Sequence, residues 1–280
     1  MTIVEALLAC LPKGVVVAPE DIEPRYLGDW TCVNASARPA AWALPRTTED
    51  VAIVMSTCQA NRCPVVIQGG RTGLAGGATP ADGWVIMSLE RMRAVGAPDT
   101  ASATICAEAG ATLQAVQLAA DGADMLFPLD IGGRGSCTVG GHISTNAGGN
   151  RVLRYGMMRE LVLGMEVVLA DGTILTSLNT MLKNNTGYDL KQWFIGSEGT
   201  LGVVTRAVLR LFPKPTNSQT ALCAVQSYAQ VIELLSLARV RLGSTLAAYE
   251  VMWPTFYELG TARSARRAPL PIGSAAYILV

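Results

Sequence analysis

The stretch from Pro64 to Gly77 constrains this chain more than any other. The apolar run after Pro64 predicts a buried strand that is entered from a turn. Five glycines then fall within the nine residues from Gly69 to Gly77. Because glycine has no Cβ, backbone N–H groups can crowd around one point, and an anion such as a phosphate is the usual ligand of such a loop. A glycine-rich turn that binds nothing is the alternative.

Two familiar phosphate-binding motifs are excluded at this loop. A Walker loop requires Gly-Lys-Ser/Thr, and no lysine occurs between Lys13 and Lys183. The Rossmann spacing leads into a helix, whereas this loop leads through turn residues 80–83 to a strand-like run at 84–89. The order strand, loop, strand therefore predicts a different architecture.

A second glycine-rich segment runs from Phe127 to Asn150. It holds seven glycines and six Ser, Thr or Asn residues, with few charges. Small residues with hydroxyl and amide groups suit a wall against a large, flat, polar ligand. A buried connector between subdomains is the alternative. Two such segments about fifty residues apart predict a binding site more strongly than either one does alone.

Composition excludes several classes of protein. The 280 residues carry no net charge and only 16% charged side chains, which argues against binding to nucleic acid. No apolar run approaches the ~18 residues of a membrane span. Glu5 lies where a signal peptide would be basic, so the N-terminus is expected to form an amphipathic helix.

Histidine and cysteine usage narrow the chemistry further. His142 is the one histidine, so a multi-histidine metal centre within this chain is excluded and no metal is expected. Seven cysteines without a C-x-x-C pair indicate reduced thiols, from which we expect a cytoplasmic location.

The pattern of apolar residues and turn signals predicts a mixture of helices and strands. Asp171-Gly172 predicts a hairpin turn, and Pro213-Lys214-Pro215 is a stiff break that marks a candidate domain boundary. Helices are predicted from Thr47 or Thr48 through 58, with Val51, Val54, Met55 and Cys58 on one face, and at 112–120 and 228–242. Strands are predicted at 41–44, 64–68, 84–89, 105–109, 161–170, 173–176, 203–212, 221–225, 245–251 and 275–280.

Four residues in the two glycine segments are candidates for chemistry. His142 is either a general base or a packing residue, and Cys137 is either a nucleophile or a small packing residue. Asp130 either accepts a hydrogen bond from a ribityl or ribose hydroxyl or caps a turn. Arg71 either neutralises a phosphate, orients a substrate carboxylate or is solvated. No constellation performs acid–base or nucleophilic chemistry by itself, which indicates that a bound cofactor supplies the chemistry.

Several motifs occur in an order that is typical of one family. After the first glycine segment come Gly135-Ser-Cys-Thr-Val-Gly-Gly141 with Thr145-Asn-Ala-Gly-Gly149, Leu169-Ala-Asp-Gly172, and Asn185-Thr-Gly-Tyr-Asp-Leu190 with Gly196-Ser-Glu-Gly-Thr-Leu-Gly-Val-Val-Thr205. Together they resemble the FAD-linked oxidases of the vanillyl-alcohol-oxidase type. The branch with the greatest resemblance is that of the D-lactate, D-2-hydroxyglutarate and glycolate dehydrogenases, and the likeness covers roughly Tyr26 to Ala276.

The resemblance implies an α+β fold. A PCMH-type (p-cresol-methylhydroxylase-type) FAD-binding domain of two α+β subdomains would occupy residues 1–216. The start of a ferredoxin-like α+β cap domain, incomplete in this chain, would occupy residues 217–280. Members of this branch are longer, and their catalytic histidine and metal ligands lie in the part beyond this match. We therefore expect a truncated member, a fragment or a subunit completed by a partner.

The resemblance also implies the cofactor and its contacts. The residues expected to hold the FAD diphosphate are Gln68, Gly69, Gly70, Arg71, Thr72, Gly73 and Gly76. Those expected along the ribityl chain and ring are Pro128, Asp130, Gly135, Ser136, Cys137, Gly141, Ser144 and Thr145. Gly202 and Val204 would close on the adenine side or the flavin edge. Relatives with covalent flavin carry a histidine where this chain has Arg71, so FAD is expected to be non-covalent.

The implied function is FAD-dependent oxidation of a D-2-hydroxy acid of the lactate, 2-hydroxyglutarate or glycolate class. The electron acceptor would be a quinone, a cytochrome or an electron-transfer flavoprotein. A companion subunit or a homodimer would complete the site, and no catalytic residue is assigned within this chain. The alternatives are a catalytically incomplete FAD-loaded subunit and an alcohol or sugar oxidase on the same fold.

Overall fold

The computed structural model describes residues 1–31, 33–263 and 268–280. The described chain divides into two compact units. The first unit comprises Met1–Phe127, Gly132–Ala147 and Met158–Lys214. The second unit comprises Pro128–Ile131, Gly148–Met157 and Pro215–Val280.

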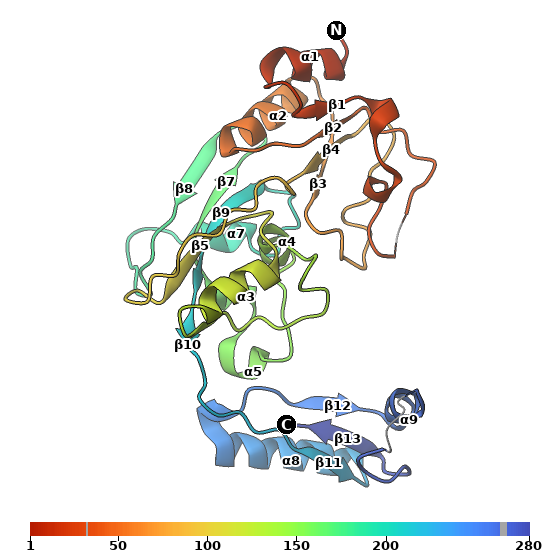
Figure 1. Cartoon of the computed structure of the whole chain (residues 1–280), viewed down its shortest axis with the longest axis vertical. Coiled ribbons are helices and arrows are strands. Elements are labelled where there is room, and N and C mark those ends of the chain that lie inside the picture. Colours follow the sequence, from red (N-terminus) through yellow and green to blue (C-terminus); the bar gives the residue numbers. More distant parts are fainter. Residues whose placement is uncertain (32, 264–267) are drawn as a thin grey trace. The chain divides into compact units, whose positions relative to one another are not determined.

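The first sheet of unit 1 has the strand order β1-β2-β4-β3 (Figure 1). Strands β2 (Ala41–Ala43), β4 (Val85–Ser88) and β3 (Val65–Gln68) are parallel, and β1 (Val16–Val17) pairs antiparallel to β2. Parallel strands are usually buried on both faces, and every residue of β2 and β4 is buried. The predicted strands are thus confirmed, and β3 and β4 end together, because Gln68 pairs with Ser88.

Helices α1 (Ile3–Cys10) and α2 (Thr48–Ala60) share a core with one face of this sheet. Thr47 caps α2 by accepting a hydrogen bond from the Asp50 N–H, as its sequence predicts. The predicted apolar face of α2 is confirmed except at Met55, which is only half-buried. The opposite face of the sheet carries a smaller core of Tyr26, Trp42, Leu44, Val66 and Ile86. Two short 3₁₀ turns, η1 (Pro19–Asp21) and η2 (Pro24–Tyr26), lead into it.

The second sheet of unit 1 is antiparallel, with the order β5-β9-β7-β8. Its strands are β5 (Thr104–Glu108), β9 (Val203–Arg210), β7 (Val162–Val168) and β8 (Ile174–Ser177). The turn from β7 to β8 lies at Asp171-Gly172, as predicted. Val168 and Val203 belong to the same core as α2, so this helix packs between the two sheets.

Short elements complete unit 1. They are α3 (Leu113–Asp121), α4 (Val139–Ser144), α6 (Met158–Leu161), α7 (Lys191–Phe194), and the pair β6 (Met125–Leu126) and β10 (Phe212–Pro213). The sequence did not predict α4, because Gly140 and Gly141 disfavour a helix. The structure explains it by a cap, in which the Thr138 hydroxyl accepts from the Gly141 N–H at 3.4 Å.

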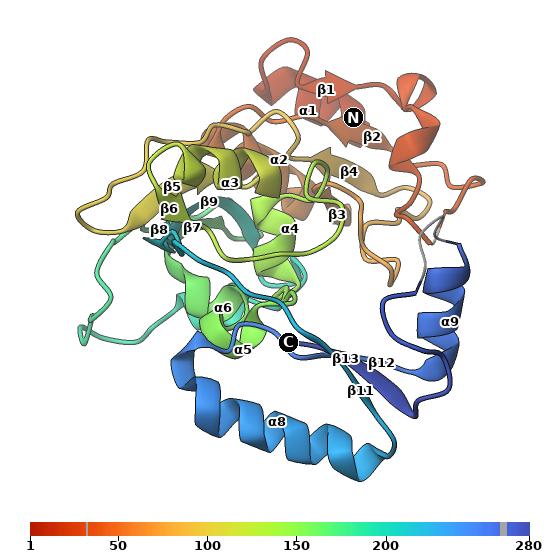
Figure 2. The same cartoon turned by 60° about the horizontal axis from the view of Figure 1, so that its bottom comes forward.

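In unit 2, β11 (Leu222–Val225), β13 (Ala276–Leu279) and β12 (Glu250–Met252) form an antiparallel sheet in the order β11-β13-β12. Helix α8 (Tyr228–Leu242) runs along this sheet (Figure 2) and packs Val231 against Ala276 and Ile278. The predicted strand at 245–251 is confirmed only at its end, because η3 (Gly243–Thr245) occupies its start and β12 begins at Glu250. Two helices of this unit, α5 (Val152–Tyr155) and α9 (Pro254–Ala262), were not predicted.

Three further properties concern the described residues only. No helix among them is long and apolar enough to cross a membrane. No three His, Cys, Asp or Glu side chains within them are grouped so as to hold a metal ion. Their six cysteines are free thiols, and Cys32 lies outside the described residues.

A buried carboxylate joins the second sheet to α2. Glu166 of β7 is 3% exposed and receives two hydrogen bonds from Arg206 of β9, at 2.6 and 2.8 Å. The hydroxyls of Thr48 and Thr205 donate to the same carboxylate at 2.6 and 2.9 Å. The hydrogen bonds from Arg206, with those from the two threonines, lower the pKa of Glu166 to about 2.

We predict that Glu166→Gln lowers the free energy of unfolding at pH 7 by about 2 kcal/mol, because charge-assisted hydrogen bonds are lost. The folded pKa lies below the usual value of 4.5. The contribution of Glu166 is therefore complete above pH 4.5 and lost as the pH falls from there toward 2. Urea unfolding at pH 7 and pH 3 measures both effects. The exposed Glu20→Gln is the control, and an equal loss at both pH values would contradict the prediction.

Candidate functional site

The first glycine segment begins where β3 ends, at the carboxyl edge of the parallel strands. Gln68 is fully buried, and its Nε2 donates to the carbonyls of Tyr26 and Ala78, at 2.8 and 2.7 Å. The bond to Ala78 closes the base of the loop formed by residues 69–77. Asp29 holds the far side, where its Oδ2 accepts from the Gly76 N–H at 2.7 Å.

The backbone N–H groups of residues 70–75 are free within the described part of the chain. No hydrogen bond there uses them, although the N–H of Gly76 is bound to Asp29. Arg71 adopts a left-handed conformation with φ +54°, which is uncommon outside glycine. Where a left-handed residue alternates with a right-handed one, successive backbone N–H groups point into one concavity. Such a concavity, called a nest, binds anions. The loop therefore fits a phosphate group.

The second glycine segment packs directly onto the first. A Cβ on Gly70 would lie 2.0 Å from the Ser136 carbonyl oxygen, and one on Gly69 would lie 2.3 Å from Thr138 Oγ1. These glycines are thus required for the approach of the two segments, a role that the sequence did not reveal. Gly140 similarly allows α4 to approach Ala109, since a Cβ there would lie 2.8 Å from that of Ala109.

A third segment, residues 196–202, completes the arrangement. The N–H groups of Gly196 and Glu198 donate to the carbonyls of Ile143 and Ser144, at 3.0 and 2.8 Å. The carboxylate of Glu198 reaches to within 3.3 Å of where a Cβ of Gly77 would be. Three segments that are far apart in the sequence therefore converge around the nest.

The predicted site residues of these segments differ in exposure. Gly135, Ser136 and Thr145 are exposed, and Gly141 and Ser144 are half-buried. Cys137, Gly202 and Val204 are buried, and burial raises the pKa of the Cys137 thiol. A protonated, buried thiol is a packing group rather than a nucleophile.

Two predicted residues belong to the other compact unit. Pro128 and Asp130 lie in unit 2, so the residues of the second glycine segment are divided between the two units. Within unit 2, the Asp130 carboxylate lies 3.3 Å from the Arg151 guanidinium, and the Asp130 carbonyl accepts from the Asn150 N–H at 3.2 Å. An ion pair that the sequence did not predict thus engages Asp130.

His142 of α4 is 3% exposed. Neither ring nitrogen makes a hydrogen bond with the described residues, and burial lowers the pKa of His142 to about 4. With this pKa the imidazole is neutral near pH 7, and its burial keeps it away from solvent. The packing role, rather than the general-base role, fits this environment.

Sequence reasoning missed four residues that organise the first loop. Asp29 binds the Gly76 N–H, and Thr138 packs on Gly69. Tyr26 and Glu90 hydrogen bond to each other, and both contact Arg71. Local sequence carries no signal for these contacts, since the partners are separated by up to 69 positions in the chain.

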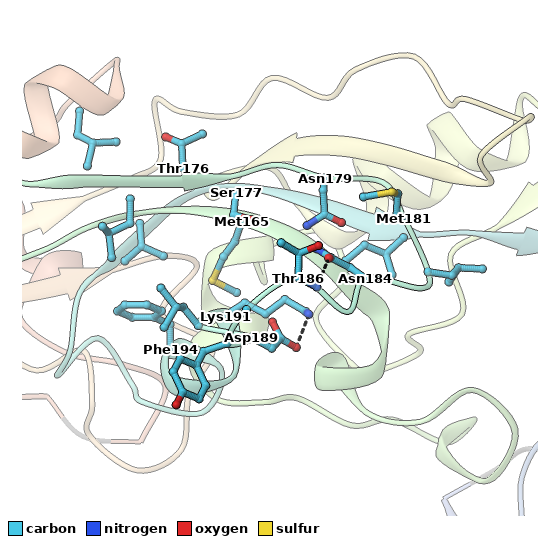
Figure 3. Close-up of a pocket in the computed structure, with 18 residues that line it drawn as sticks. Met165, Thr176, Ser177, Asn179, Met181, Asn184, Thr186, Asp189, Lys191 and Phe194 are labelled. Carbon is cyan, nitrogen blue, oxygen red and sulfur yellow. Dashed lines mark hydrogen bonds and ion pairs between the residues drawn. The ribbon is translucent and has the colours of Figure 1, made fainter.

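A separate cavity of about 410 Å³ lies between the β7–β8 hairpin and the polar loop that leads to α7 (Figure 3). Met165 and Phe194 contribute apolar surface, and Asn184 and Thr186 contribute polar groups. Its one lysine, Lys191, is bound to Asp189 at 2.6 Å. None of its lining residues belongs to the predicted cofactor set, so the cavity and the converging segments are distinct features of unit 1.

Comparison with known proteins gives the following relatives. The family model of the FAD binding domain matches residues 39–177. Mitochondrial D-2-hydroxyglutarate dehydrogenase of Bos taurus is 42% identical over 88% of this chain and 45% of its own length. D-2-hydroxyglutarate dehydrogenase of Xanthomonas citri pv. viticola is 42% identical over 83% of this chain and 48% of its own length. A putative mitochondrial D-lactate dehydrogenase of Schizosaccharomyces pombe is 40% identical over 84% of this chain and 45% of its own length. The chain thus spans about half the length of these curated relatives.

Solved structures agree on the fold. Alkyldihydroxyacetonephosphate synthase matches with a TM-score of 0.82 at 17% identity, covering 99% of this chain and 54% of that protein. p-Cresol methylhydroxylase matches with a TM-score of 0.76 at 20% identity, and the match covers 99% of this chain and 59% of that protein. The predicted α+β, PCMH-type fold is confirmed.

The expected cytoplasmic location is wrong. The relatives from Bos taurus, Danio rerio and Schizosaccharomyces pombe are named as mitochondrial proteins. Free cysteines indicate only a reducing environment, so they could not distinguish one reducing compartment from another.

We predict that Gly70→Ala destabilises the protein by about 2–3 kcal/mol, because the added methyl group would overlap the Ser136 carbonyl. Gly132→Ala is the matched control, since a Cβ there would meet nothing within 4 Å. Thermal unfolding with and without FAD compares the two variants. Similar stability of both would contradict the proposed close approach of the segments.

We predict that His142 titrates with a midpoint near pH 4. NMR of the untagged chain reports this directly, because the sequence contains no other histidine. The folded pKa lies below the usual value of 6.5, so the unfolded chain binds the proton first and stability falls as the pH drops from 6.5 toward 4. A midpoint near 6.5 would show that the ring is exposed.

Proposed function

We propose that this chain, whose residues 39–177 match the family model of the FAD binding domain, is the flavin-binding part of a dehydrogenase that oxidises a D-2-hydroxy acid to the 2-oxo acid. The observation that carries this proposal is the likeness to D-2-hydroxyglutarate and D-lactate dehydrogenases over most of the chain. The FAD-binding domain supports FAD as the cofactor. The substrate would be a small acid of the lactate, 2-hydroxyglutarate or glycolate class.

The free N–H groups of residues 70–75 are proposed to bind the FAD diphosphate. The arrangement of the loop supports this, because Gln68 closes its base and Asp29 fixes Gly76 without filling the nest. The remaining residues proposed along the cofactor are Gly69, Pro128, Asp130, Gly135, Ser136, Cys137, Gly141, Ser144, Thr145, Gly202 and Val204. Non-covalent binding is proposed, since the guanidinium of Arg71 does not form a bond to a flavin.

FAD, when bound, supplies the acceptor for the hydride that leaves the carbinol carbon. The protein must position the substrate and accept the hydroxyl proton. Burial keeps His142 neutral and away from solvent, so this residue is unsuited to that task. We propose that the proton acceptor and any metal ligands come from polypeptide beyond the described residues, from a companion subunit or from a second copy.

The domain division is proposed as a FAD-binding domain at 1–216 and the beginning of a cap domain at 217–280. Two features support it: the second compact unit resumes at Pro215, and its sheet contains three strands covered by α8.

A second candidate is an FAD-loaded subunit that does not turn over alone. The observation that favours it is the buried, neutral state of the one histidine. In either case the electrons would pass to an acceptor such as a quinone, a cytochrome or an electron-transfer flavoprotein.

We predict that the purified chain shows flavin absorption bands, and that anaerobic D-lactate or D-2-hydroxyglutarate bleaches them. The L enantiomers are the control for stereospecific reduction. Bands that persist with every acid would favour the incomplete-subunit candidate. Absence of flavin, even after incubation with FAD, would contradict the proposed cofactor site.

A further inference from the structure

We propose that Tyr26 and Glu90 are positioning residues that hold the Arg71 guanidinium beside the anion nest, where it binds the FAD diphosphate. This inference rests on the proposed FAD site and adds a specific device to it. A glycine loop alone offers backbone donors, whereas this chain also places a restrained cation within the loop.

The Arg71 side chain is held in place by its neighbours, but one of its nitrogen donors has no acceptor among the described residues. Its Cζ lies 4.3 Å from the centroid of the Tyr26 ring, a cation–π distance. Its Nη1 lies 4.0 Å from Glu90 Oε2, which is too long for a hydrogen bond. Nη1 is buried and makes no hydrogen bond with the described residues. A buried donor without an acceptor is costly, so this geometry favours an anionic ligand that accepts from it.

The carboxylate of Glu90 is itself fixed by Tyr26. The Tyr26 hydroxyl lies 2.8 and 2.7 Å from the two carboxylate oxygens. Burial, together with the hydrogen bond to Glu90, raises the pKa of Tyr26 above its usual value, so the hydroxyl remains a donor. Glu90 thus faces Arg71 in one orientation and attracts the guanidinium without occupying its Nη1.

Tyr26 is a rigid support for this arrangement. It is fully buried, its ring centroid lies 4.1 Å from that of Trp42, and its carbonyl accepts from Gln68. Through Gln68 it is connected to the base of the glycine loop. The ring, the carboxylate and the loop are therefore fixed relative to one another within unit 1.

A double-mutant cycle tests whether Tyr26 acts through Arg71. The dissociation constant of FAD is measured by flavin fluorescence during titration of the deflavinated chain. Arg71→Met is expected to weaken FAD binding about tenfold or more, because a charge-assisted hydrogen bond is lost. It is also expected to reduce the dependence of binding on NaCl concentration, since a cation–anion contact is screened by salt.

Tyr26→Phe keeps the ring beneath the guanidinium and removes only the bond to Glu90. We expect it to weaken FAD binding about threefold in the native background and to have no effect in the Arg71→Met background. Arg25→Met is the matched control, because its guanidinium also lies over the Tyr26 ring, at 4.7 Å, but is exposed and paired with Glu23. Its effect is expected to stay below twofold.

Glu90→Gln provides an independent variant if Tyr26→Phe does not fold. It should weaken FAD binding when Arg71 is present, and it should leave binding unchanged or tighten it in the Arg71→Met background, where Glu90 only repels the diphosphate. Equal effects of either variant in both backgrounds would overturn the positioning role while leaving the FAD site intact. Failure of the native chain to bind FAD would overturn the proposed function and this inference together.

Discussion

The close approach of two backbones at Gly70 and Ser136 is the constraint on which the candidate site depends. A Cβ at Gly70 would lie 2.0 Å from the Ser136 carbonyl oxygen, so no larger residue fits without displacing one segment. This contact brings together segments from the parallel sheet and from the start of α4. The third segment then joins through the hydrogen bond from Glu198 to Ser144. Contacts between backbone atoms therefore hold the segments of the candidate site together.

Two carboxylates organise the donors of the first loop without neutralising the nest. Asp29 binds the N–H of Gly76, at the end of the loop, and leaves residues 70–75 free. Glu90 lies near Arg71 but outside hydrogen-bonding distance. Acidic residues beside an anion site would ordinarily oppose binding, yet here Asp29 fixes the end of the loop and Glu90 lies beside the Arg71 guanidinium. Pre-ordering of this kind reduces the entropy that a ligand must overcome.

The chemical groups in this chain suit binding of a cofactor better than acid–base catalysis. The groups gathered at the candidate site are backbone donors, small side chains and one arginine, all suited to holding a cofactor. Its single histidine is buried and neutral, so this residue is not suited to acid–base chemistry. Because the curated relatives are about twice as long, a flavin-binding role for this part and a catalytic role for another part are compatible with both candidate functions.

The sequence alone determined the local elements and the kind of ligand. Apolar runs predicted β3 and β4, the Thr47 cap predicted α2, and the glycine segments with the family motifs predicted an FAD fold. The formation of α4 and the contacts between distant side chains were decided only by the tertiary structure. Helix α4 forms despite two glycines because a threonine caps it and those glycines allow close packing. Tyr26 meets Glu90 across 64 positions because η2 packs against the sheet and Glu90 follows the end of β4. Contacts of this kind depend on how distant segments pack, and no local pattern encodes that.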